Sequence, residues 1–175
     1  LLKTFATQAV IAIENVRLFN ETKDGLEQQT AISEILRVIS ESPADVLPVL
    51  ETVGQRAAKI CESPYVDVLL VEGDKVRMAA RVGELGGLAQ RALVPIDRAW
   101  LAGRAILERT VVHVTDILGP DGDDFPPARE LAQKFGYRTM LAVPLVREQR
   151  ALGAILLRRV EVRPFTDKQI TLLKT

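Results

Sequence analysis

The chain has 175 residues, with 23 Lys and Arg balanced by 23 Asp and Glu, and it contains one His, one Cys and one Trp. Zero net charge argues against a nucleic-acid-binding domain, because such domains need a basic surplus to neutralise phosphates. One Cys allows neither an internal disulfide nor a four-cysteine zinc site, and one His excludes every metal motif that needs two. Hydrophobic residues make up 47% of the chain, but no apolar run approaches the ~20 residues of a membrane-spanning helix.

Residues 1–41 carry a helical pattern. Apolar side chains follow steps of three and four at Leu2, Phe5, Ala9, Ala12, Val16 and Phe19. The apolar stripe is broad, so we expect this long helix to pack against a second copy of the chain. The sequence begins inside the pattern, without Met and without a signal peptide, and we interpret it as a fragment of a longer protein.

A second helix and a hairpin follow. Residues 42–62 combine capping residues with an apolar stripe, which predicts a helix. The β-branched run 65–72 and the alternating run 75–82 flank a Gly73-Asp74 turn, and this pattern predicts a β-hairpin.

The middle of the chain alternates short elements with loops. We expect a short strand at 93–96, a helix over 98–109 capped by Asp97, and a strand at 111–114. The segment 118–127 is rich in Gly, Pro and Asp, and its length is typical of a functional or mobile loop.

The last third predicts a helix, a hairpin and another helix. The helix covers 128–135 and ends at Gly136, and the hairpin pairs 139–146 with 151–160.

The final helix starts with a capping box formed by Thr166 and Gln169. Residues 172–175 repeat the Leu-Leu-Lys-Thr of residues 1–4, which is compatible with chance or with a tandem array of domains.

Two residues carry nucleophilic or acid–base potential. Cys61 lies on the apolar stripe of a helix, where a small buried hydrophobe is the usual role of Cys. His113 lies on a strand, on the face opposite Val112 and Val114. It is either a pocket residue or a half-buried structural His. Neither has the neighbours of a catalytic site, so we expect no catalytic residues.

Other side chains suit a ligand pocket. Trp100 and Phe125 are large enough to line one between helices and sheet, with core packing as the alternative. Arg104 and Arg138 are candidate anion partners, although solvated arginines are common. The Asp residues of the 118–127 loop lack the spacing of a calcium loop, and we expect no metal site.

The order of these elements resembles a GAF domain, the small-molecule sensory module of bacterial signalling proteins. The resemblance covers about residues 40–175 and rests on an ordered set of short motifs. These are Val94-Pro95, Gly103-Arg104-Ala105, Val112-His113-Val114-Thr115-Asp116, Arg138 to Leu145, Leu152 to Leu156, and Pro164-Phe165-Thr166-Asp167. Residues 5–15 resemble the last helix of a preceding GAF domain.

The resemblance implies an α+β, GAF/PAS-like fold: a central antiparallel sheet with flanking helices, preceded by a long N-terminal signalling helix. It implies a connecting and dimerising helix at 1–41, a sensory domain at 42–165 and the start of an outgoing helix at 166–175. It also implies an unidentified ligand at Trp100, Arg104, His113, Asp116, Phe125 and Arg138. The motifs of cyclic-nucleotide-binding, bilin-binding and methionine-sulfoxide-reducing members are absent, so we expect no cofactor.

The resulting hypothesis is a cytoplasmic sensory module of a bacterial two-component sensor histidine kinase with tandem GAF domains. It would bind a small molecule and relay its state through homodimeric N- and C-terminal helices, without contacting nucleic acid or membrane in this segment. Two alternatives stay open. One is a dimerisation spacer without a ligand, and the other is a GAF-like thiol enzyme that uses Cys61 and His113.

Overall fold

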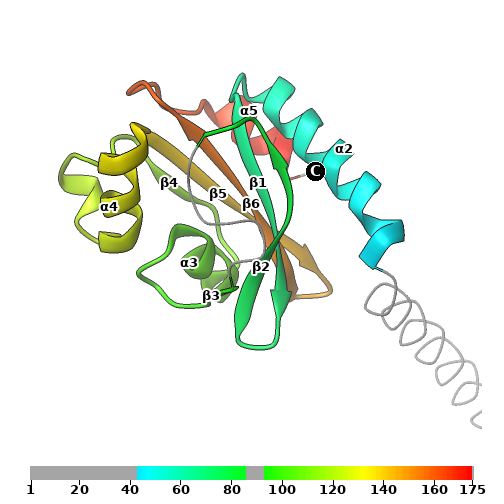
Figure 1. The fold of residues 1–175 in the computed structure, drawn as a ribbon. Coiled ribbons are helices and arrows are strands. Elements are labelled where there is room, and N and C mark those ends of the chain that lie inside the picture. Colours follow the sequence, from blue (N-terminus) through cyan, green and yellow to red (C-terminus); the bar gives the residue numbers. More distant parts are fainter. Residues whose placement is uncertain (1–42, 86–92, 175) are drawn as a thin grey trace, which may run out of the picture. The chain divides into compact units, whose positions relative to one another are not determined.

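A computed structural model describes residues 43–85 and 93–174 (Figure 1). The helix expected over residues 1–41 lies outside the described residues. From Leu47 onward the chain forms one compact unit, and the description below concerns that unit.

The core of the unit is a six-stranded antiparallel sheet in the order β3-β2-β1-β6-β5-β4. Its strands are β1 (Tyr65–Glu72), β2 (Lys75–Val82), β3 (Leu93–Pro95), β4 (Val112–Val114), β5 (Thr139–Arg147) and β6 (Arg150–Arg159). Both predicted hairpins are confirmed, and so are the two short strands at the edges.

The two hairpins meet along β1 and β6, the central pair of the sheet. In this antiparallel register Asp67 lies opposite Leu156, and Val68 lies opposite Ile155. Alternation along each strand then sends neighbouring residues to opposite faces of the sheet.

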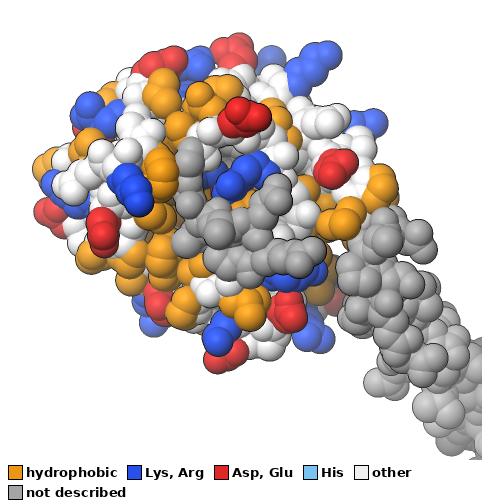
Figure 2. All heavy atoms as spheres, viewed as in Figure 1, with side chains coloured by type: hydrophobic (Ala, Val, Ile, Leu, Met, Phe, Trp, Pro, Cys, Tyr) orange, Lys and Arg blue, Asp and Glu red, His pale blue; other side chains and the backbone are white. Residues whose placement is uncertain are grey.

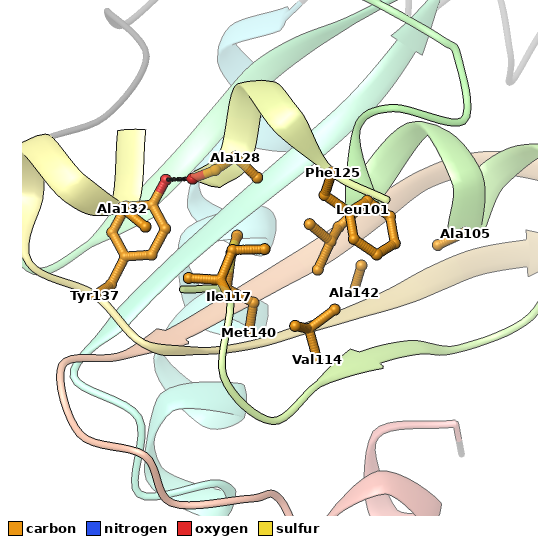
Figure 3. Close-up of a cluster of buried hydrophobic side chains, with 10 residues drawn as sticks. All are labelled: Leu101, Ala105, Val114, Ile117, Phe125, Ala128, Ala132, Tyr137, Met140 and Ala142. Carbon is orange, nitrogen blue, oxygen red and sulfur yellow. Dashed lines mark hydrogen bonds between the residues drawn. The ribbon is translucent and has the colours of Figure 1, made fainter. Parts of the chain in front are cut away.

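One face of the sheet is covered by α3 (Leu101–Glu108) and α4 (Pro126–Phe135), with a short 3₁₀ turn, η1 (Pro120–Gly122), before α4 (Figure 1). Buried residues of these helices pack on β4 and β5 (Figure 3). The cluster consists of Leu101, Ala105, Val114, Ile117, Phe125, Ala128, Ala132, Tyr137, Met140 and Ala142.

The opposite face carries α2 (Pro43–Ile60) and α5 (Asp167–Leu173). Its buried cluster consists of Ala57, Cys61, Val66, Leu141, Val143, Ile155, Leu157 and Phe165. The sheet therefore separates two hydrophobic layers, and α2 and α5, near the two ends of the described chain, belong to the same layer.

The predicted end of α4 and the predicted start of α5 are confirmed. Gly136 ends α4 with φ 80°, and the Thr166–Gln169 capping box begins α5. Asp97 was expected to cap a helix from residue 98. Its carboxylate instead accepts the N–H of Ala99 at 2.9 Å in the preceding turn, and α3 begins at Leu101.

On the face in Figure 2, basic and acidic side chains of the described residues are interspersed, without one large patch of either sign. Among the described helices, none has the length and apolarity that crossing a bilayer requires.

Candidate ligand-binding site

A cavity of about 40 Å³ lies between the sheet and helices α3 and α4. Its wall is shared by the cluster shown in Figure 3 and by a second apolar cluster on the same face of the sheet, around β1, β2 and β3. Apolar lining residues include Leu69, Val76, Val94, Leu101, Met140 and Leu156. A small organic molecule with an apolar part fits such a wall better than a fully hydrated ion does.

One wall of the cavity is charged, because Asp67 and Arg158 line it too. The Asp67 carboxylate accepts hydrogen bonds from Arg158 Nη2 and, at 2.7 Å, from Arg81 Nε. The side chains of Asp67 and Arg158 are only 5% and 4% exposed, and that of Arg81 is 18% exposed. Because these three side chains are largely shielded from water, removing one of them would leave the charge of its partner uncompensated.

Tyr137 adds a hydroxyl to the same wall. Its hydroxyl donates to the carbonyl of Ala128 at 3.2 Å (Figure 3), and the Arg158 guanidinium lies 5.5 Å from its ring centroid. Burial raises the pKa of Tyr137 to about 12, so its phenol stays protonated at neutral pH.

The Nε–H of Arg158 is buried and has no hydrogen-bond acceptor within the described part of the chain. An unpaired buried donor costs roughly 1–3 kcal/mol. The charged wall of the cavity thus holds one N–H group, Nε of Arg158, without a hydrogen-bond acceptor in the described part of the chain.

Among the predicted ligand residues, Trp100 lines this cavity. Phe125 is buried in the neighbouring cluster and is not among the described lining residues, nor is Arg104. The Arg104 guanidinium lies 4.3 Å from the Phe125 ring centroid and pairs with Asp124 at 3.1 Å. Arg104 also donates from Nε to the carbonyl of Arg98 at 3.2 Å.

Asp116, just before the 118–127 loop, and Arg138, after α4, form a pair joined by two hydrogen bonds. Arg138 Nε and Nη2 donate to the Asp116 carboxylate at 2.8 and 2.5 Å, and the N–H of Leu118 donates to it at 3.1 Å. The hydrogen bond from Arg138 lowers the pKa of Asp116. The pair has a clear structural role in fixing the loop, and it does not line the cavity.

Arg129 holds the same loop from α4. Its guanidinium donates to the carbonyls of Gly119 at 2.8 Å and Leu118 at 2.9 Å, and to Asp123 at 2.6 Å. The 118–127 segment is therefore closely bonded to the helix that follows it. Within the described chain, no three His, Cys, Asp or Glu side chains gather as metal ligands would.

His113 lies on the opposite face of the sheet, away from the cavity. Its Nε2 accepts the N–H of Phe165 at 3.2 Å, and the two rings meet edge to face at 5.7 Å. Burial lowers the pKa of His113, and the positive charge of Arg159 lowers it further, against an opposing effect of Asp167. The neutral form accepts this bond, so His113 positions the start of α5.

Cys61 is buried on that same face, directly after α2. Burial raises the pKa of its thiol to about 11, although Arg159 partly opposes the shift. A buried, protonated thiol is a poor nucleophile.

Arg159 connects these elements. Its guanidinium donates to the carbonyls of Cys61, Arg163 (2.6 Å) and Pro164 (3.1 Å), and lies 4.0 Å from the Phe165 ring centroid. One buried cation thus binds the end of α2 and the segment that leads into α5.

Sequence reasoning missed the charged wall. Asp67 is the one charged residue in the middle of an apolar strand, and Arg158-Arg159 close another apolar strand. Charged residues inside buried strands are signals of pairing, because unpaired charges are rarely buried. The charged residues inside apolar strands therefore predict that Asp67, Arg158 and Arg159 are paired, but the sequence does not identify the partner of each.

Residues 44–175 match the family model described as GAF domain. The chain belongs to the GAF family. A search of curated proteins with this sequence finds no match.

Solved structures share the fold. A GAF domain/HD domain protein from Geobacter sulfurreducens superposes with TM-score 0.63 at 20% identity, over 76% of this chain and 87% of that one. A type II free methionine-R-sulfoxide reductase from Thermoplasma acidophilum gives 0.60 at 16%, over 75% and 86%. A methyl-accepting chemotaxis protein, residues 122 to 287, gives 0.61 at 18%, over 78% and 85%. At these identities the likeness concerns the fold alone, and GAF folds carry different functions.

Proposed function

We propose that this GAF domain is the small-molecule sensor of a bacterial signalling protein, specifically a cytoplasmic sensor histidine kinase. The observation that carries the proposal is the cavity between the sheet and helices α3 and α4, whose largely apolar wall includes the buried ion pair of Asp67 and Arg158. Apolar pockets with a few polar groups are the usual form of small-molecule sites. Fold neighbours that include a chemotaxis protein are consistent with a signalling role.

The path from cavity to helices runs along β6. Arg158 lines the cavity, and its neighbour Arg159 binds the carbonyl of Cys61 after α2 and the carbonyls of Arg163 and Pro164 before α5. A ligand that shifts β6 would move the anchor of both helices together. It changes the output only if it binds two arrangements of these helices with different affinity.

Dimerisation through the flanking helices belongs to the same proposal. Val49 and Ile60 on α2 are 59% and 40% exposed, and Leu172 on α5 is 50% exposed. Large apolar side chains on the two helices that bracket the domain suit a second copy of the chain as partner.

Different features bear on the two rival functions. A thiol enzyme is poorly supported, because Cys61 is buried and its pKa is raised. A ligand-free spacer is favoured by the small volume of the cavity, about 40 Å³.

A fluorescence and thermal-shift screen of small metabolites on the purified chain separates sensor from spacer. Trp100 is the only Trp of the chain and lines the cavity, so its emission reports binding there. The sensor predicts at least one saturable ligand that changes Trp100 emission and raises the melting temperature. A library of metabolites of many classes that leaves both unchanged would establish the spacer.

A further inference from the structure

We infer that a groove at the edge of the sheet binds a short aliphatic dicarboxylate, with one carboxylate on Arg109, the other on Lys174 and the hydrocarbon chain on the apolar floor. The groove shares no lining residue with the cavity between the sheet and helices α3 and α4, so this inference goes beyond the proposed sensory function. Three observations lead to it: the open edge of β5, two cations without acidic partners, and the size and lining of the groove.

The groove lies where β5 extends past the edge strand of the sheet. β4 pairs with β5 at residues 140–142, and in the described chain no strand continues beside the next part of β5 on that side. Val143, Pro144 and Val146 of this part line the groove, together with Val111 just before β4. Val146 is 47% exposed. A ligand with a hydrocarbon part would remove this apolar surface from water.

Two cations line the same groove. Arg109 directly follows α3, and Lys174 directly follows α5. The Arg109 guanidinium donates a hydrogen bond to the carbonyl of Gln149 at 3.0 Å. No carboxylate of the described residues pairs with Arg109 or Lys174, and none lines the groove. The described lining of the groove therefore carries two positive charges and no negative charge.

Acidic residues that are close in the sequence pair with other arginines. Glu108 directly precedes Arg109, but its carboxylate lies 3.0 Å from Arg98 Nε. Glu148, in the turn between β5 and β6, lies 3.8 Å from Arg147 Nε. A groove lined by charges of one sign attracts ligands of the opposite sign. Two negative groups match the two cations, whereas a monoanion leaves one of them without a partner.

The lining favours carboxylates on a hydrocarbon chain over an inorganic anion. A guanidinium binds a carboxylate through a planar fork, and an ammonium binds it as a point charge. The side chains of Val111, Val143 and Val146 offer no hydrogen bonds, so this floor favours hydrocarbon over phosphate or sulfate. The volume of about 300 Å³ lies at the lower end of small-molecule sites, which suits an acid of a few carbons better than a segment of another protein.

The experiment titrates the purified chain with succinate, glutarate and adipate and follows the methyl resonances of Val111, Val143 and Val146 by NMR. The monomethyl ester of the tightest of these ligands keeps the hydrocarbon chain but carries one charge, and sulfate carries two charges without a chain. We expect the dicarboxylate to bind saturably and at least about tenfold more tightly than either comparison ligand. The emission of Trp100, which reports on the other cavity, should stay unchanged.

Two matched variants test the role of Lys174. K174Q removes one cation at an exposed position, and we expect the dicarboxylate to bind about tenfold more weakly. K168Q makes the same change at an exposed position of α5 outside the described lining of the groove, and it should leave the affinity unchanged. The ester and sulfate comparisons use the unaltered protein, so the inference can fail whether or not K174Q folds.

Each outcome decides the inference. Equal affinity for the dicarboxylate and its monoester, equal affinity for the dicarboxylate and sulfate, unaltered binding by K174Q, or no saturable binding would overturn it. Methyl shifts confined to Leu69 and Val76 would also overturn it, because they would place the ligand in the cavity of the proposed sensor. Methyl shifts at the groove valines would support the inference even if the metabolite screen on Trp100 finds no ligand and the sensory function fails.

Discussion

Arg158 and Arg159 are neighbours in the sequence, yet their guanidinium groups lie on opposite faces of the sheet. Arg158 binds Asp67 at the cavity, and Arg159 binds the carbonyl of Cys61 between the sheet and the flanking helices. Both are almost fully buried. Strand β6 thus places one buried cation in each of the two hydrophobic layers of the domain.

Replacing Arg159 by Met should destabilise the domain by about 3 kcal/mol, because three carbonyl acceptors lose a charged donor. Urea unfolding followed by circular dichroism measures the loss. Arg150→Met, at an exposed position of the same strand, is the control and should change the free energy of unfolding little. A loss below about 1 kcal/mol would show that these bonds contribute little.

Asp67→Asn should cost about 4 kcal/mol, because it leaves Arg158 and Arg81 without their shared negative partner. Adding Arg158→Met removes the second buried charge and should restore part of the stability. Chemical unfolding of the two single variants and the double variant gives the coupling energy. Strictly additive losses would mean that the pair is not coupled.

Much of the fold follows from local signals. The hairpin around Gly73-Asp74 and the capping box at Thr166 each depend on residues that are close together in the sequence. The structure confirms the hairpin and the capping box. The candidate site depends on distant pairs such as Asp67 with Arg158, which no local pattern specifies. For the same reason the sequence does not distinguish His113 from residues that line the cavity. Periodicity places it opposite Val112 and Val114 but does not tell which face of the sheet holds the cavity.

The stability of the domain should fall as the pH drops below about 6.5, because the pKa of His113 is lowered from 6.5 by burial. The folded state favours the neutral imidazole that accepts the Phe165 N–H. Its contribution is therefore complete above the unfolded pKa and is lost as the pH falls through the lower folded pKa. Urea unfolding across this range should show a pH dependence that His113→Gln reduces.

The same residue offers a direct check. The chain has a single His, so one imidazole resonance reports its titration by NMR. A folded-state pKa at or above 6.5 would contradict the assigned role of His113 as a neutral acceptor.

Cys61 should resist thiol reagents while the protein is folded. With a pKa of about 11, only about one thiol in a thousand is ionised at pH 8, and the side chain has no exposed surface. Titration with a disulfide reagent should show no rapid reaction in buffer and one equivalent in denaturant. Fast reaction of the folded protein would restore the thiol-enzyme hypothesis.

The pairing of β1 with β6 also sets an order of events during synthesis. Asp67 and Arg158 are separated by 91 positions, so the middle of the sheet cannot close until nearly the whole domain has left the ribosome. Contacts so distant in sequence slow folding, because a long loop must close before they form. Until β6 arrives, β1 has one unpaired edge and a carboxylate without its partner. A chain that ends before β6 therefore lacks the central strand pair as well as the charged wall of the cavity, and we expect it to be captured by chaperones or degraded.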